Sequence, residues 1–239
     1  MDTIKINKKD TLLIAHRGLS GIERENTCAS FIAAGNRSHY GIETDIHLTK
    51  DNVFVISHDA NTKRVSPFTQ EIKDTNYQDL QKIDYYELNT TTTKPYIKMP
   101  TLKEYLEICE KYNKHSVIEI KPLFKVSEIK RLLKEIKEIR KLDDVTIIAF
   151  DLRNLLRLRK LDETIKIQYL ASKYTDELLD ICKTNNFGID IHYGALTPSV
   201  IKNFKDSGIV INAWTVNDKD VAKSLIESGV DFITTNILE

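Results

Sequence analysis

The sequence predicts an α/β fold, a TIM (β/α)8 barrel with a small insertion after the second strand region, from two observations. Short β-rich runs alternate with amphipathic, helix-like stretches over most of the chain, which indicates repeated strand–helix units around a parallel sheet. Eight such runs occur in 239 residues, and a TIM barrel commonly uses about 250 residues as one domain. A doubly wound open sheet would give a similar alternation, and we favour the barrel.

The expected strands are short runs rich in β-branched and aromatic residues. They span residues 11–16, 41–48, 116–121, 145–150, 165–170, 188–192, 208–214 and 231–235. Helix-like patterns lie between them, and the clearest is 127–142, where apolar residues recur at helical spacing and charged residues occupy the other face.

The second expected strand is followed by a turn and a returning segment. Lys50-Asp51-Asn52 is a turn signal, so the run VFVISH that follows is expected to fold back antiparallel on residues 41–48. This fold-back returns His58 to the level at which the strand ends.

The regular order then breaks until about residue 116. Residues 60–100 hold three of the five prolines, a threonine run and several tyrosines, and we predict a small insertion there, followed by one helix. The threonine run is read as a polar loop. We expect residues 1–239 to form a single TIM-barrel catalytic domain that contains this insertion.

Composition narrows the classes of partner and the compartment. Lys plus Arg and Asp plus Glu number 35 each, without a basic stripe, so a nucleic-acid partner is not expected and a small molecule is. Three widely spaced cysteines, Cys28, Cys109 and Cys182, predict reduced, buried thiols. With neither a signal-peptide pattern nor an apolar run of roughly 20 residues, we expect a cytoplasmic protein without stable membrane association.

Three acids are predicted to face the barrel axis near the carboxyl ends of the strands, where barrel enzymes build their sites. Side chains alternate along a strand, so Glu43 and Asp45 share one face, and Glu119 shares a face with Lys121. Trp214 lies on the inward face of a later strand by the same parity. Three inward carboxylates repel one another unless a cation lies among them, and all-oxygen ligands suit Mg²⁺ or Ca²⁺ better than zinc.

Two histidines and two fixed cations are expected at the same rim. His16 and His58 end separate segments, so one is able to take a proton while the other gives one, and Arg17 with Lys121 suits a phosphate. His47 shares the inward parity but lies further up the rim, where it touches substrate or water. The side chains without such company, taken as structural, are His39, His115 and Cys28.

Taken in order, several blocks resemble the glycerophosphodiester phosphodiesterase family. They are HRG (16–18), EN (25–26), ETDIHLTKDNVFVISHD (43–59), MPTL (99–102), IEIKP (118–122), AFD (149–151) and AWTVN (213–217). The resemblance spreads over the chain and implies a TIM barrel that hydrolyses a glycerophosphodiester to glycerol 3-phosphate and an alcohol.

The resemblance also implies roles for individual residues. The metal ligands would be Glu43, Asp45 and Glu119; the acid–base pair His16 and His58; the phosphate ligands Arg17 and Lys121; and the pocket wall Trp214. Gly18 would let the chain turn sharply beneath the site.

Two departures from the family pattern bear on the pocket rim and on substrate preference. Arg24 stands where the family usually has proline before Glu-Asn, and residues 233–236 read ITTN where an aspartate is common after the first threonine. Two alternatives stay open: a lysophospholipid-cleaving, phospholipase D-like enzyme of the same superfamily, and a non-catalytic phosphometabolite-binding barrel.

Overall fold

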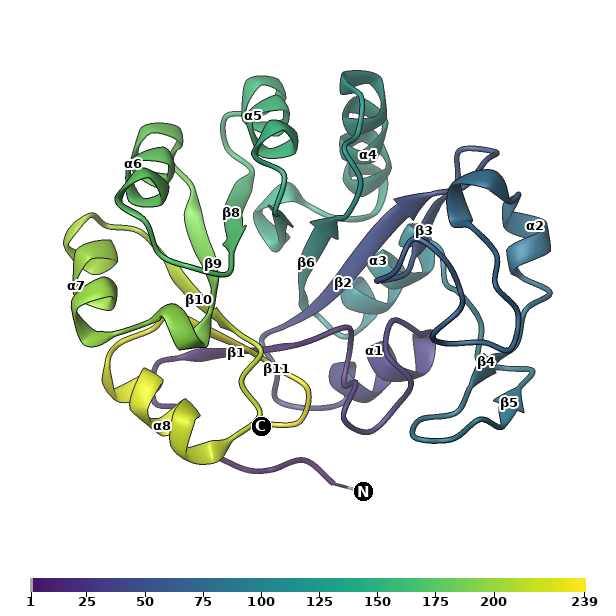
Figure 1. Cartoon of the computed structure of the whole chain (residues 1–239), viewed down its shortest axis with the longest axis horizontal. Helices are drawn as coiled ribbons and strands as arrows, with labels where there is room; N and C mark the ends of the chain where they lie inside the picture. Colours follow the sequence, from purple (N-terminus) through teal and green to yellow (C-terminus); the bar gives the residue numbers. More distant parts are fainter. Residues whose placement is uncertain (1) are drawn as a thin grey trace.

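The parallel strands form a closed ring in the computed structural model, which describes residues 2–239. Strand order around the sheet is β1-β11-β10-β9-β8-β7-β6-β2, and β1 also pairs with β2, which closes it (Figure 1). These strands are β1 (Leu12–Ala15), β2 (Gly41–Leu48), β6 (His115–Ile120), β7 (Val145–Ala149), β8 (Lys166–Ala171), β9 (Gly188–His192), β10 (Ile211–Trp214) and β11 (Phe232–Thr235). The predicted TIM barrel is therefore confirmed and the open sheet is excluded.

Helices surround the ring and cover its outer face (Figure 1). They are α1 (Cys28–Gly35), α3 (Leu102–Lys111), α4 (Val126–Ile139), α5 (Leu152–Leu161), α6 (Asp176–Asn185), α7 (Pro198–Asp206) and α8 (Lys219–Glu227), with 3₁₀ turns at Leu142–Asp144 and Tyr193–Ala195. Capping residues set where several of them begin. Thr101, for example, accepts a hydrogen bond from the Glu104 amide while the Glu104 side chain accepts one from the Thr101 amide, a capping box that starts α3. Across residues 2–239, no helix has the length and apolar character that crossing a bilayer requires.

Most element boundaries lie within a residue of expectation, and two differ by three residues for local reasons. Helix α4 ends at Ile139, short of the expected residue 142, because buried Arg140 turns out of the helix and donates hydrogen bonds to Glu110 and to the Lys114 carbonyl oxygen. Strand β10 begins at Ile211, later than the expected 208, because Gly208 sits at φ 70° just after α7. In both cases the chain must leave a helix before it can extend.

Alternation along the strands separates two apolar regions. Ile42 and Ile118 face outward, where they join the large core between ring and helices. Ile14, Val117 and Ile148 belong to a second, smaller cluster and alternate with outward-facing neighbours, so they fill the barrel interior. The parity that predicted inward acids is therefore the parity of the folded strands.

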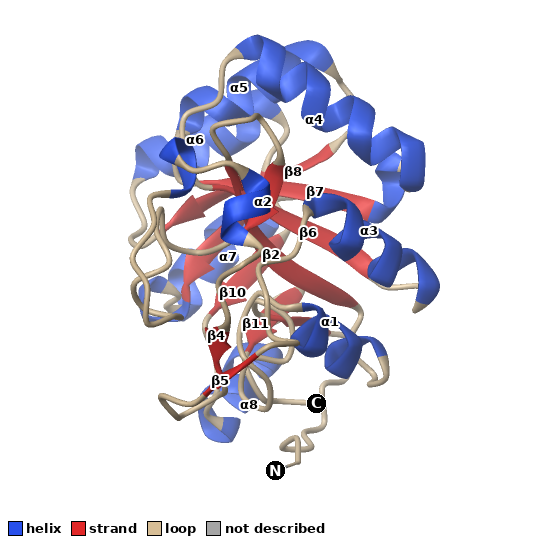
Figure 2. Ribbon diagram, turned by 90° about the vertical axis from the view of Figure 1, so that its right-hand side faces the viewer, coloured by secondary structure: helices blue, strands red, loops and turns tan. Residues whose placement is uncertain are grey.

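The segment after β2 folds back as expected. Strand β3 (Phe54–Ile56) pairs antiparallel with β2, with Ile56 opposite Ile46. The insertion then carries a 3₁₀ turn (Ile72–Asp74), α2 (Tyr77–Leu80) and the hairpin of β4 (Tyr85–Tyr86) with β5 (Thr93–Lys94), before α3. Figures 1 and 2 show α2, β4 and β5 together on one side of the barrel.

The insertion has an apolar cluster of its own, which its polar composition did not predict. The cluster is Val55, Val65, Ile72, Leu80, Ile83, Tyr85, Ile97 and Met99. Most of the threonine run forms the turn of the hairpin, as expected, although Thr93 already belongs to β5.

The three cysteines are free. Cys109 and Cys182 are buried, as predicted, whereas Cys28 at the start of α1 is only half-buried, so the prediction for this residue was wrong. Cys28 is the first residue of a helix on the outside of the barrel, so part of its side chain stays accessible to solvent.

We expect Gly18→Ala to destabilise the fold more than Gly208→Ala. Both glycines adopt positive φ, 73° and 70°, so each substitution incurs the left-handed backbone cost of about 1–2 kcal/mol. A Cβ on Gly18 would also lie 2.6 Å from the Ser30 carbonyl carbon, whereas one on Gly208 meets nothing within 4 Å. Urea unfolding should show an additional loss of about 1–3 kcal/mol for Gly18→Ala. Equal losses would mean that the crowding is relieved without cost.

Candidate active site

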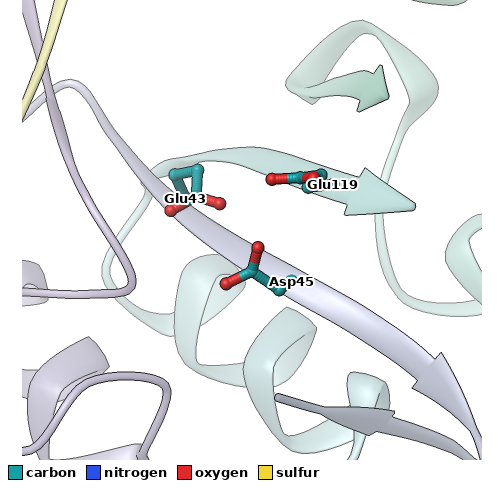
Figure 3. A group of neighbouring side chains, drawn as sticks. All are labelled: Glu43, Asp45 and Glu119. Carbon is teal, nitrogen blue, oxygen red and sulfur yellow. The ribbon is translucent and has the colours of Figure 1, made fainter. Parts of the chain in front are cut away.

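Three buried carboxylates meet inside the barrel. Glu43 and Asp45 project from β2, and Glu119 projects from β6, where it is the direct register partner of Asp45 (Figure 3). One oxygen from each residue lies within 4.8 Å of the others. The sequence parity predicted this convergence.

These carboxylates cannot all ionise easily in that environment. Burial and the charge of Asp45 raise the pKa of Glu43 well above its usual range and that of Glu119 to about 7. Burial opposes ionisation of Asp45 too, but the charges of Lys121 and Arg17 hold its pKa at about 2. A hard divalent cation among the three would relieve this repulsion, so the cluster could hold one.

Two fixed cations flank the acids. Lys121 Nζ lies 2.9 Å from Glu119 Oε1 and 3.5 Å from Asp45 Oδ1. Arg17 Nε lies 3.5 Å from Asp45 Oδ2, and this buried nitrogen has no hydrogen-bond acceptor among residues 2–239. A buried donor without an acceptor is costly and suits contact with an anion.

The His-Arg-Gly sequence turns the chain sharply at the end of β1. Arg17 and Gly18 both adopt left-handed backbone, at φ 54° and 73°, and the first of these is a strained conformation for a side chain with Cβ. The Arg17 amide donates to Glu43 Oε2 at 2.7 Å, which anchors the strained turn on the acid cluster. Backbone and side chain of Arg17 therefore both serve this site.

Each predicted histidine contacts a side-chain oxygen that can only accept a hydrogen bond. His16 Nδ1 lies 2.7 Å from Asn236 Oδ1, and His58 Nδ1 lies 2.7 Å from Asp59 Oδ1. Both neutral rings must therefore carry hydrogen on Nδ1, which leaves Nε2 as an acceptor. Burial, with Arg17 nearby, lowers the pKa of His16 to about 4; burial also lowers the pKa of His58, while the charge of Asp45 opposes that shift.

Several residues that support the site were not assigned a role from sequence. Asn26 donates to Asp45 Oδ2 at 2.7 Å, and Glu25 accepts from Arg17 Nη1 at 2.8 Å. Asp59 and Asn236 are the histidine partners. The motif blocks that contain Glu25, Asn26 and Asp59 were a usable signal, whereas Asn236 appeared only as the last residue of the ITTN stretch that departs from the family pattern.

Three further histidines bond to the chain around them. His47 is buried and its Nε2 lies 3.3 Å from the His58 carbonyl oxygen, so it supports the segment that carries His58. His39 pairs with the Leu238 carbonyl oxygen, and His115 Nε2 with Thr146 Oγ1.

Trp214 stands at the carboxyl end of β10. Its Nε1 donates to the Asp190 carbonyl oxygen at 3.1 Å, and its ring meets Phe150 and His192 edge-on, with centroids 5.9 and 5.3 Å away. An aromatic wall therefore stands at the rim, at the end of a different strand from the acids.

The sequence profile of the Glycerophosphoryl diester phosphodiesterase family matches residues 16–239. The chain belongs to this family. A glycerophosphodiester phosphodiesterase of Caldanaerobacter subterraneus is 30% identical over 230 residues, which cover 95% of this chain and 94% of the relative.

Solved structures agree with the family fold. A glycerophosphodiester phosphodiesterase from Parabacteroides distasonis is 28% identical with a TM-score of 0.78, covering 96% of this chain and 94% of its own. A phosphodiesterase from Oleispira antarctica, solved with the product sn-glycerol-3-phosphate, has a TM-score of 0.86 over 94% of this chain and 92% of its own at 24% identity. At 24% identity, the similarity to the Oleispira antarctica structure supports the fold alone.

We expect Glu25→Gln to cost stability in a pH-dependent way. Burial opposes ionisation of Glu25, but hydrogen bonds from Arg64 and the charge of Arg17 hold its pKa at about 2, below the usual 4.5. A depressed carboxyl pKa stabilises the fold fully above the unfolded value and loses that effect as pH falls toward 2. Urea unfolding should therefore separate variant from wild type at pH 7 and bring them together near pH 2–3. Glu23→Gln, at a nearby position without an ion pair among the described residues, is the control. A separation independent of pH would contradict the charge argument.

Proposed function

We propose that this protein hydrolyses glycerophosphodiesters to glycerol 3-phosphate and an alcohol in a metal-dependent reaction. The observation that carries the proposal is the meeting of three buried carboxylates, two histidines and two cations at the carboxyl end of the barrel. Membership of the family supports the reaction class. The non-catalytic alternative draws no comparable support, since a barrel without catalysis has no need of this strained and charged site.

The metal ligands in this proposal are Glu43, Asp45 and Glu119, which fit Mg²⁺ or Ca²⁺ because all three offer hard carboxylate oxygens. A bound divalent cation would supply charge stabilisation at the phosphate and its bridging oxygens. Arg17 and Lys121 would add fixed positive charge on the phosphate oxygens. The Nε atom of Arg17, buried and without an acceptor in the described chain, supports that role.

His16 and His58 would move the protons. A neutral His16, favoured by its pKa of about 4, suits the base that takes a proton at Nε2 from the attacking oxygen, which belongs to water or to the substrate's own glycerol hydroxyl. In the second case water must then open the cyclic phosphate to give glycerol 3-phosphate. His58 bonds Asp59, a carboxylate that stabilises the imidazolium form, so it suits the acid that gives its Nε2 proton to the departing alcohol. The bond from phosphorus to the alcohol oxygen breaks as the new bond to the attacking oxygen forms.

The substrate we favour is a soluble, deacylated diester in the cytoplasm. Trp214 would cover the glycerol backbone. A lysophospholipid would need a continuous apolar face for its acyl chain, and the insertion tyrosines Tyr77, Tyr85 and Tyr86 were the candidates. Tyr85 is 2% exposed and packs inside the insertion cluster, so the three tyrosines form no continuous outer face.

Activity should depend on a divalent metal and on each acid. We expect EDTA to abolish glycerol 3-phosphate release from glycerophosphocholine and Mg²⁺ or Ca²⁺ to restore it, because the buried acids need a cation. Glu119→Gln should lower kcat by roughly 10²-fold or more, as removal of one group that stabilises the transition state does. Glu43→Gln and Asp45→Asn should do the same.

The same assay tests the alternatives. Glu110→Gln, a change on the outer surface of α3, should leave activity unchanged and is the control. Full activity in excess EDTA would contradict metal dependence, and a higher kcat/KM for lysophosphatidylcholine together with vesicle binding would favour the lipid enzyme. Chelation should lower the melting temperature as well as the activity, because a bound cation stabilises the folded state.

The histidines should differ in their response to the leaving group. We expect His16→Ala and His58→Ala each to lower kcat on glycerophosphocholine by about 10²- to 10⁴-fold, the usual contribution of a positioned proton carrier. An activated aryl phosphodiester needs little protonation of its leaving group, so it should partly rescue His58→Ala and not His16→Ala. Rescue of His16→Ala alone would reverse the two roles.

A further inference from the structure

Arg64, at the start of the insertion, bridges two carboxylates from different segments. Its Nη1 and Nη2 donate to Glu25 Oε2 and Oε1 at 2.6 and 2.8 Å, and its Nε donates to Asp59 Oδ2 at 2.6 Å. Glu25 belongs to the loop between β1 and α1, and Asp59 follows β3. One planar guanidinium therefore fixes the distance between two loops that reach the barrel rim separately.

Each of these carboxylates also holds a residue of the proposed active site. Glu25 Oε1 accepts from Arg17 Nη1 at 2.8 Å, and Asp59 Oδ1 accepts from His58 Nδ1 at 2.7 Å. A single intervening carboxylate therefore links Arg64 to each of two proposed active-site residues. Glu25 links it to Arg17, a phosphate ligand, and Asp59 links it to His58, the general acid.

We propose that Arg64 is a positioning residue that fixes His58 and Arg17 relative to one another through Asp59 and Glu25. The inference rests on the proposed function and goes beyond it, since Arg64 itself lies outside the predicted acid–base, metal and phosphate groups. Without Arg64, Asp59 would lose the donor that holds its second oxygen and could rotate away from the His58 ring. Glu25 would keep Arg17 as its cationic partner and compete with the phosphate for it.

A simpler role for Arg64 would be to tie the insertion to the barrel, and Arg24 provides the matched control for that role. Arg24 lies in the same loop as Glu25, and its Nε and Nη2 donate to the Tyr86 and Glu87 carbonyl oxygens at 2.7 and 2.6 Å. It ties the insertion to the barrel as Arg64 does, but its hydrogen bonds end on backbone. Arg24→Met therefore loosens the insertion and removes a positive charge from the same loop without removing a hydrogen bond to Glu25 or Asp59.

The experiment compares Arg64→Met, Arg64→Lys and Arg24→Met with wild type, all with saturating Mg²⁺ and with glycerophosphocholine as substrate. We expect Arg64→Met to lower kcat by about 10- to 100-fold, because small misplacement of a reacting group has that effect, and also to raise KM through Arg17. Arg64→Lys should restore little, since one ammonium group cannot hold two carboxylates in a fixed fork. Arg24→Met should change kcat by less than about threefold, although it should lower the melting temperature about as much as Arg64→Met does.

A double-mutant cycle with Asp59→Asn tests the route. If Arg64 acts through Asp59, the double variant should be about as slow as the slower single variant. Multiplicative effects on kcat, or a kcat for Arg64→Met equal to that of Arg24→Met, would overturn the inference. If Arg64→Met fails to fold, Arg64→Lys carries the same cycle. The proposed function is tested separately. If wild type with metal releases no glycerol 3-phosphate, both proposals fail. If wild type is active, His58→Ala is inactive and Arg64→Met has the kcat of wild type, only the inference about Arg64 is overturned.

Discussion

Mutual repulsion among three buried carboxylates is the constraint on which the rest of this site depends. Asp45 and Glu119 are register partners on neighbouring strands, so the barrel itself forces their charges together. The fold cannot move them apart without shifting a register that also sets which residues face the core. Positive charge and hydrogen-bond donors must therefore be brought to the acids by the surrounding loops, and much of the rim's local geometry follows from that need.

Those donors reach the site at the ends of segments. Arg17 comes from a left-handed turn, and Asn26, also at positive φ, donates to Asp45. Such backbone conformations cost free energy and persist because the acids hold them. The same loop then supplies Glu25, which accepts a hydrogen bond from Arg17 Nη1 and so shares this cation with Asp45. Anions and cations consequently alternate outward from the barrel axis, from Asp45 through Arg17 and Glu25 to Arg64.

Sequence could predict the strands and their parity because period-two alternation is a local property, and it therefore placed Glu43, Asp45 and Glu119 on the axis. It could not predict the partners of the side chains that the loops bring to the rim. Asn236 meets His16 across 220 positions, and Arg64 meets Glu25 across 39. Such contacts depend on where loops close, and no repeat in the sequence encodes that. The apolar cluster of the insertion was missed for a related reason: apart from Val55 in β3, most of its members are separated by polar residues in the sequence and come together only when the segment folds.

The two departures from the family pattern lie at the same rim, and each has a physical equivalent. A proline before Glu-Asn would restrict the loop through its fixed φ, whereas Arg24 restricts it by hydrogen bonds to the β4 strand and the residue after it. The ITTN stretch carries no aspartate, and its Asn236 orients the His16 ring without placing a negative charge beside it. Because Asn236 is neutral, burial and the charge of Arg17 dominate the pKa of His16 and lower it, so the ring stays neutral. A neutral ring is able to receive a proton, which is the role of His16 in the proposed reaction.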